Sequence, residues 1–158
     1  MLNYRLMGRS GLRVSDVALG TMLFGATSGW GVSAETAKEL YDTFRAEGGN
    51  YLDTANQYAG GESERIIGGL VAEHREEVVI ASKYTNSAPR NGDANAGGNQ
   101  RKNMVQSVEG SLRRLNTDYL DLYSQGSTGS SGRTERRTVS SSSRPRNARR
   151  PAQTRRSP

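Results

Sequence analysis

Between residues 17 and 123, short apolar runs alternate with longer amphipathic segments, and this alternation limits what the chain can form. The runs predicted as strands lie at 17–19, 50–55, 77–83 and 118–123. The segments predicted as helices lie at 33–49, 63–71 and 104–115. Strands that alternate with helices form a parallel sheet with right-handed crossovers. We therefore expect an α/β fold.

Apolar residues at helical spacing indicate which faces of the predicted helices pack on the sheet. Ser33 is a good N-cap for the first helix. The apolar face of that helix comprises Ala37, Leu40, Tyr41 and Phe44. The second carries Ile66, Ile67, Leu70 and Val71. The third carries Met104, Val105, Val108, Leu112 and Leu115.

Two parallel architectures fit this order of elements. A (β/α)₈ barrel typically needs about 250 residues, so this chain would supply its first half. A predicted hairpin at residues 4–15 precedes the first strand of the sheet. A doubly wound open sheet is the alternative, but the first strand–helix turn, "GTMLFGATSGWG", lacks the compact G-x-G-x-x-G of dinucleotide-binding folds.

The composition changes abruptly at residue 125. Residues 125–158 contain nine Arg and one acid, a net charge of +8, so residues 1–124 of this +6 chain carry −2. The segment is rich in Ser and Pro and has almost no apolar side chains. It cannot offset an ordering entropy of about 1–2 kcal/mol per residue. We therefore expect a domain at 1–124 and a disordered tail at 125–158.

The absence of cysteine excludes disulfides, thiol nucleophiles and zinc–thiolate sites. No signal peptide and no apolar run near the roughly 20 residues of a membrane span are recognisable. We expect a soluble, cytoplasmic protein with no bound metal.

Three residues with acid–base chemistry follow neighbouring predicted strands. Asp53 ends the second strand, Lys83 ends the third, and Tyr58 lies in the loop after Asp53. Carboxyl ends of parallel barrel strands meet at one rim, where functional groups gather. An ammonium beside a phenol favours the phenolate, and a carboxylate keeps the ammonium charged and oriented. Such a phenol can give a proton to an oxygen that gains negative charge. Simple pairing or capping at strand ends is the other interpretation of the same spacing.

Four segments carry a resemblance to a known family: "GTMLFG", "NYLDTANQYAGGESERIIGGL", "VVIASKY" and "SLRRLNTDYLDLY". Together they closely resemble the N-terminal half of the aldo-keto reductases over residues 2–123. The resemblance implies a (β/α)₈ TIM barrel whose bottom is closed by an N-terminal hairpin. It also implies NADPH-dependent reduction of an aldehyde or ketone.

The resemblance also implies roles for individual residues. The family uses a catalytic tetrad of Asp, Tyr, Lys and His, and Asp53, Tyr58 and Lys83 match its first three members. Residues expected beside the nicotinamide and its ribose are Gly20, Thr21, Met22 and Asp53. Phe24 and Trp30 fall in a loop that walls the substrate pocket in the family, and loop packing is the alternative for both.

The fourth member of the tetrad is missing at its expected place. By spacing that place is Gly126, and the only histidine, His74, lies at the end of the second helix, where we expect it to be exposed. The residues that hold the nicotinamide carboxamide and the adenosine phosphate belong to later strands of the family. We therefore expect a truncated and inactive reductase, and a reading-frame shift would explain the change after residue 123.

Two other functions remain open at this stage. The Arg-rich tail of a binding module could contact nucleic acid or an acidic partner, although it lacks aromatic residues for base stacking. A four-stranded half-barrel also leaves two open sheet edges, through which copies could associate.

Overall fold

The computed structural model describes residues 1–27, 29–86 and 93–126. The predicted tail at 125–158 lies outside these residues except for its first two. Its expected disorder, its binding role and the frameshift hypothesis therefore stay predictions.

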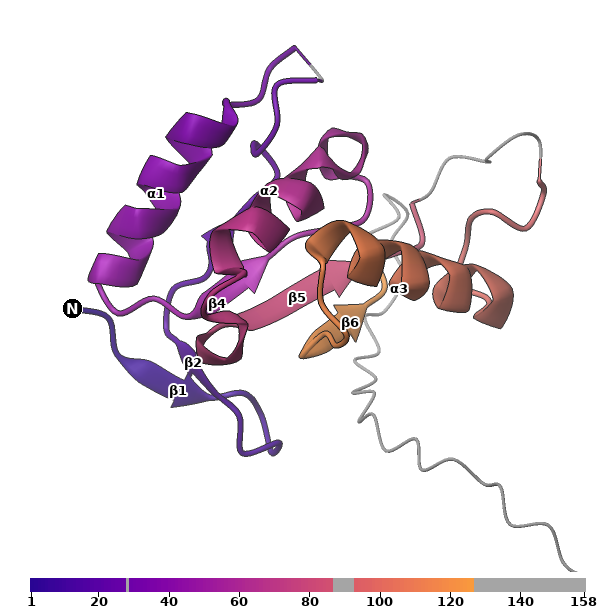
Figure 1. Ribbon diagram of the computed structural model, residues 1–158. Coiled ribbons are helices and arrows are strands. Elements are labelled where there is room, and N and C mark those ends of the chain that lie inside the picture. The colour runs from indigo at the N-terminus through magenta and orange to yellow at the C-terminus, as the bar shows by residue number, and fades with distance from the viewer. Residues whose placement is uncertain (28, 87–92, 127–158) are drawn as a thin grey trace, which may run out of the picture.

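Six strands and three α-helices make up the described chain (Figure 1). An antiparallel hairpin comprises β1 (Tyr4–Leu6) and β2 (Arg13–Ser15). The parallel strands are β3 (Leu19–Gly20), β4 (Tyr51–Asp53), β5 (Val79–Lys83) and β6 (Leu122–Ser124). The helices are α1 (Ala34–Ala46), α2 (Glu62–Val71) and α3 (Arg101–Leu115). Two short 3₁₀ turns are η1 (Tyr58–Gly61) and η2 (Arg75–Glu77).

The strand order decides between the two predicted architectures. The parallel strands lie side by side in sequence order, β3-β4-β5-β6. The three helices cover one face of the sheet (Figure 1). A doubly wound sheet would reverse its strand order and carry helices on both faces. The predicted half of a (β/α)₈ barrel is therefore confirmed. Strands β3 and β6 are the edges of this sheet, and association through them stays a prediction.

The hairpin lies against the amino ends of the parallel strands, as predicted. Asn50, directly before β4, accepts a hydrogen bond from the Ser15 backbone N–H at 2.7 Å. Its Nδ2 donates to the Arg13 carbonyl at 3.1 Å. Val14 is buried between these two contacts. The hairpin thus closes the end of the sheet opposite the strand ends that carry Asp53 and Lys83.

The two edge strands begin later than predicted. The ladder of β3 consists of Leu19 beside Leu52 and Gly20 beside Asp53, and Val17 is exposed before it. Strand β6 covers 122–124 rather than 118–123. Apolar runs predicted both strands, but each ladder starts inside the neighbouring strand, at Leu52 of β4 and at Ala81 of β5. Before the ladder of β6, the Ile80 N–H donates to the Asp121 carboxylate at 2.9 Å rather than to a backbone carbonyl.

Helix α1 begins as predicted, because the Ser33 side chain accepts a hydrogen bond from the Thr36 N–H at 3.3 Å. Ala37 and Tyr41 are buried, which confirms two residues of the predicted face. Leu40 is exposed, so its assignment to that face was wrong.

The buried face of α3 also differs from the predicted apolar face. Of the predicted residues only Leu115 is fully buried, and the others are half-buried. The buried set is Asn103, Ser107, Gly110, Ser111 and Leu115. Helix α3 approaches α2 so closely that a Cβ on Gly68 would lie 2.5 Å from the Leu115 carbonyl oxygen. This close approach favours small side chains at the contact, so a polar face turns inward.

The apolar core lies between the helices and the sheet. Its buried members are Phe24, Ala37, Tyr41, Leu52, Ile67, Val71, Val78, Ile80 and Leu115. Within the described residues, no helix has the length and apolarity that a membrane span requires.

Tyr123 gives the fold a predicted dependence on alkaline pH. Burial raises the pKa of Tyr123, whose ring stacks on Tyr84 at 5.1 Å between centroids. The unfolded phenol ionises near pH 10, whereas the folded one stays neutral, so unfolding releases a proton above that pH. We expect the free energy of unfolding to fall above about pH 10, and to fall less steeply in Tyr123→Phe. Urea titrations of both proteins between pH 8 and about pH 11 measure this difference; equal slopes would contradict it.

Candidate active site

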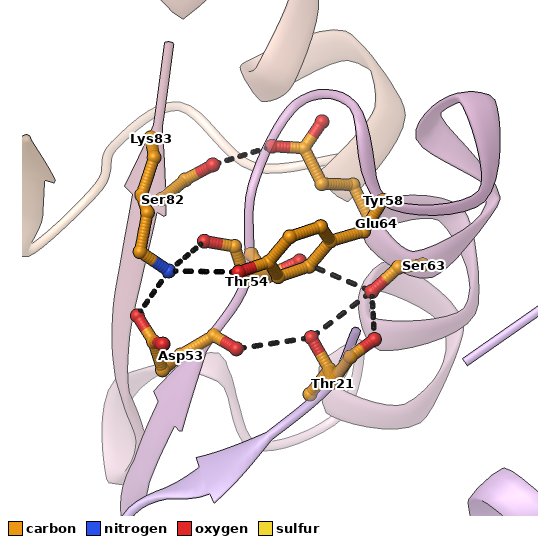
Figure 2. A network of polar contacts seen from close by, with 8 residues as sticks. All are labelled: Thr21, Asp53, Thr54, Tyr58, Ser63, Glu64, Ser82 and Lys83. Carbon is orange, nitrogen blue, oxygen red and sulfur yellow. Dashed lines mark hydrogen bonds and ion pairs between the residues drawn. The ribbon is translucent and has the colours of Figure 1, made fainter. Parts of the chain in front are cut away.

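Asp53 and Lys83 end adjacent parallel strands and meet at the carboxyl edge of the sheet (Figure 2). In the register of β4 and β5, Asp53 pairs with Ala81, two residues before Lys83, so both side chains lie on the same face. The Lys83 Nζ donates to the Asp53 Oδ1 at 2.7 Å. The Lys83 side chain is 23% exposed and the Asp53 side chain 38%, so solvent screens this pair only in part.

Tyr58 reaches the same ammonium from the turn that follows β4. Its Oη lies 3.4 Å from the Lys83 Nζ, which sits 5.2 Å from the centre of its ring. The turn η1 ends at Gly61, whose φ of +90° favours glycine. A Cβ on Gly61 would also lie 2.7 Å from the Arg114 Cδ. Glycine at this position therefore lets the Tyr58 turn fold back over the strand end.

The Lys83 ammonium has three acceptors for its three N–H donors. They are the Asp53 carboxylate, the Tyr58 hydroxyl and the Thr54 carbonyl, the last at 3.0 Å. This arrangement holds a positive charge beside a phenol oxygen. A phenol hydroxyl held beside an ammonium has the arrangement that a side-chain proton donor needs. The structure thus brings together the three residues that the strand-end pattern singled out.

The residues predicted to lie beside a cofactor divide into two groups. Gly20 and Met22 are exposed, and a Cβ on Gly20 would meet no atom within 4 Å. Open space therefore lies beside Asp53, which pairs with Gly20 across the ladder. Thr21 is fully buried, so it presents no surface to a cofactor in this structure. The end of β3 beside the Asp53 carboxylate is therefore open to solvent.

The two residues predicted as a substrate wall lie in different environments. Phe24 is 1% exposed and packs in the apolar core, which favours the packing alternative over a place in a pocket wall. Trp30 on the same loop is 59% exposed. A bridge between Phe24 and Val32 closes the loop at its base. Phe24, which follows β3 closely, therefore packs in the core, whereas Trp30, nearer the tip of the loop, is exposed to solvent.

His74 is not the exposed residue that its sequence position predicted. The His74 Nε2 lies 2.6 Å from the Tyr41 hydroxyl, and the two rings stack at 5.9 Å between centroids. Burial raises the pKa of Tyr41 above its usual value near 10, so the phenol, already neutral at physiological pH, stays neutral further into the alkaline range. The Tyr41–His74 pair connects α1 to the segment that follows α2, so His74 contributes to helix packing.

Gly126, the expected place of the fourth catalytic residue, is buried just beyond β6. Its carbonyl accepts a hydrogen bond from the Thr85 hydroxyl at 3.0 Å. A glycine supplies no side chain for proton transfer or for binding a carbonyl oxygen.

A buried ion pair behind the site escaped the sequence analysis. Glu64 on α2 is fully buried and accepts from Ser82 on β5 at 2.7 Å and from Arg114 Nε on α3 at 2.7 Å. A signal existed, because Glu64 precedes Ile67 by three residues and Val71 by seven, the spacing of one helix face. The pair ties two helices to the strand that ends in Lys83.

The fold and the cluster place the chain among (β/α) barrel proteins that carry ionisable groups at the carboxyl edge of the sheet. Residues 16–126 match the sequence model of the Aldo/keto reductase family. The chain belongs to this family.

Curated relatives and solved structures agree with that assignment. Norsolorinic acid reductase of Aspergillus flavus is 43% identical over 128 residues, which cover 74% of this chain and 32% of the relative. Aryl-alcohol dehydrogenase GME11368 of Pestalotiopsis microspora is 43% identical over 75% of this chain and 33% of its own. The holo form of aldo-keto reductase AKR11C1 from Bacillus halodurans matches with a TM-score of 0.68 and 30% identity, over 79% of this chain and 40% of that chain. The chain therefore spans about a third of the length of the curated relatives it matches.

Proposed function

We propose that the cluster of Asp53, Tyr58 and Lys83 is the proton-transfer part of an NADP-dependent aldo-keto reductase site that acts on aldehydes or ketones. The observation that carries the proposal is the Lys83 ammonium held between the Asp53 carboxylate and the Tyr58 hydroxyl. The family assignment supports the reaction class. The cysteine-free sequence supports a cytoplasmic location.

In this proposal each residue has one task. Bound NADPH would supply the hydride that reduces the carbonyl carbon. Tyr58 Oη donates its proton to the carbonyl oxygen as negative charge develops there. The Lys83 ammonium lies beside the resulting phenolate and stabilises it, and the Asp53 carboxylate orients Lys83. Gly20, Met22 and Asp53 would hold the nicotinamide end, because Gly20 pairs with Asp53 at the open end of β3 and Met22 is exposed just after that strand.

We further propose that residues 1–158, tested alone, do not turn over. Gly126 leaves the fourth catalytic position without a side chain, and the cofactor contacts of later strands in the family have no counterpart in the described residues. We therefore expect NADPH binding weaker than micromolar in a fluorescence titration. Micromolar affinity together with carbonyl reduction would contradict this expectation.

The location of the cofactor can be tested without turnover. At millimolar NADP⁺, we expect the backbone amide signals of Gly20, Met22 and Asp53 to shift in NMR spectra, while those of the α1 surface stay unchanged. Any carbonyl reduction that is measured should fall about 10²–10⁴-fold in Tyr58→Phe, which removes the proton donor. Shifts elsewhere on the surface, or reduction that survives Tyr58→Phe, would overturn the proposed site.

A further inference from the structure

We infer that Ser63 is a positioning residue for Lys83, and acts on it through a chain of buried hydroxyl groups. The inference rests on the proposed function, because it concerns the geometry of the same proton-transfer cluster. Three fully buried residues form the chain: Thr21 after β3, Thr54 after β4 and Ser63 at the start of α2 (Figure 2). None of the three touches the reacting atoms.

Hydrogen-bond distances connect the three hydroxyls directly. The Ser63 Oγ lies 2.9 Å from the Thr21 carbonyl oxygen and 3.0 Å from the Thr21 Oγ1. It also lies 3.1 Å from the Thr54 Oγ1. The Thr21 Oγ1 donates to the Asp53 carbonyl at 3.1 Å. Ser63 is therefore the point at which the ends of two strands join the helix.

The number of available protons gives the chain a direction. The Thr21 Oγ1 gives its own proton to the Asp53 carbonyl, so the single Ser63 hydroxyl proton goes to Thr21, whose carbonyl oxygen and Oγ1 both lie within reach. Thr54 must then donate to Ser63. The Asp53 carbonyl accepts from both the hydroxyl and the backbone N–H of Thr21. Each hydroxyl proton thus has an acceptor, and removal of the Ser63 Oγ leaves the Thr54 hydroxyl without the acceptor that it has in this chain.

The residues held by this chain are those that hold Lys83. Asp53 supplies the carboxylate and Thr54 the carbonyl, two of the three acceptors of the ammonium. The Thr54 N–H also donates to Ala81 on β5, so the peptide is held from both sides. The third acceptor, the Tyr58 hydroxyl at 3.4 Å, is at the long end of hydrogen-bond distances. A small shift of Lys83 would therefore separate ammonium and phenol.

A positioning role for Ser63 and a purely structural role predict different effects on Lys83 when the Ser63 hydroxyl is removed. Loss of any buried hydroxyl leaves partners unsatisfied and lowers stability. Only a hydroxyl that positions Lys83 also changes the environment of its ammonium. Ser107 on α3 offers a matched control, because it is buried and donates to Asn103 Oδ1 at 3.1 Å, away from Lys83.

The chain contains three lysines, which makes the ammonium of Lys83 observable. Lys38 and Lys102 form exposed ion pairs with Asp42 and Asp93. In protein labelled with ¹⁵N-lysine, we expect the Lys83 ammonium hydrogens to exchange with solvent more slowly than those of Lys38 and Lys102. In Ser63→Ala their exchange should become about tenfold faster, whereas Lys38 and Lys102 keep their rates and serve as internal references.

Two further variants complete the experiment. Thr54→Val removes the Thr54 hydroxyl and conserves the shape of the side chain. If Ser63→Ala does not fold, Thr54→Val should show the same faster exchange of the Lys83 ammonium hydrogens. Ser107→Ala should lower the melting temperature comparably and leave Lys83 unchanged. Unchanged Lys83 exchange in folded Thr54→Val, or equal acceleration in Ser107→Ala, would overturn the inference. The readout needs neither cofactor nor turnover, so it is independent of the cofactor-shift test of the proposed function.

Discussion

Replacing Arg114 with Met is expected to lower the free energy of unfolding by about 3–5 kcal/mol. The guanidinium donates to a Glu64 carboxylate that has no exposed surface. Removal of one partner leaves an uncompensated charge in the interior, which costs more than the loss of the hydrogen bond. Urea denaturation followed by circular dichroism would measure the change, with the slope of the transition checked for two-state behaviour.

Two controls distinguish the destabilisation caused by an unpaired buried Glu64 carboxylate from that caused by losing the arginine side chain. The double variant Glu64→Gln with Arg114→Met should recover most of the stability, because the amide can still accept from Ser82. Lys38→Met breaks an exposed pair with Asp42 and should change stability by about 0.5 kcal/mol at most. A loss below about 1 kcal/mol in Arg114→Met would show that Glu64 is not held as a buried charge.

Phe24→Ala is expected to destabilise the chain by about 3–5 kcal/mol, since it removes a fully buried aromatic ring from the core. Trp30→Ala on the same loop removes a larger but mostly exposed side chain. Its effect should stay within about 0.5 kcal/mol. The two denaturation curves therefore give a matched comparison of burial within one loop.

The comparison also tests whether Phe24 packs in the core in solution. Similar midpoints for the two variants would show that Phe24 does not belong to the core. If Trp30→Ala were strongly destabilising instead, the loop tip would pack against the protein in solution. Either result would reopen the question of which aromatic side chain faces a substrate.

The parts of the fold that depend on local pattern were predictable. Strand–helix alternation and the Ser33 cap depend on residues close together in the chain, and both are present. Asp53 and Lys83 could be placed together because parallel strands carry their carboxyl ends to one edge. Their contact follows from strand order alone. The roles of these residues in catalysis stay predictions.

The features that failed or escaped prediction all depend on a partner distant in the sequence. The inward face of α3 depends on how closely α2 approaches it at Gly68. His74 pairs with Tyr41, thirty-three residues away. A local pattern can indicate that a residue faces inward, as the spacing of Glu64 does, but it does not identify the distant partner that the residue meets.

By itself, the sequence determined the order of the elements, the family, and the strand ends at which Asp53 and Lys83 lie. Only the tertiary structure decided which side chains surround them: the buried Glu64–Arg114 pair, the hydroxyl chain through Ser63, and Phe24 rather than Trp30 in the core. The physical reason is that periodicity and capping act within a few residues. Burial and hydrogen-bond partners, in contrast, are set by chain segments that meet only after folding.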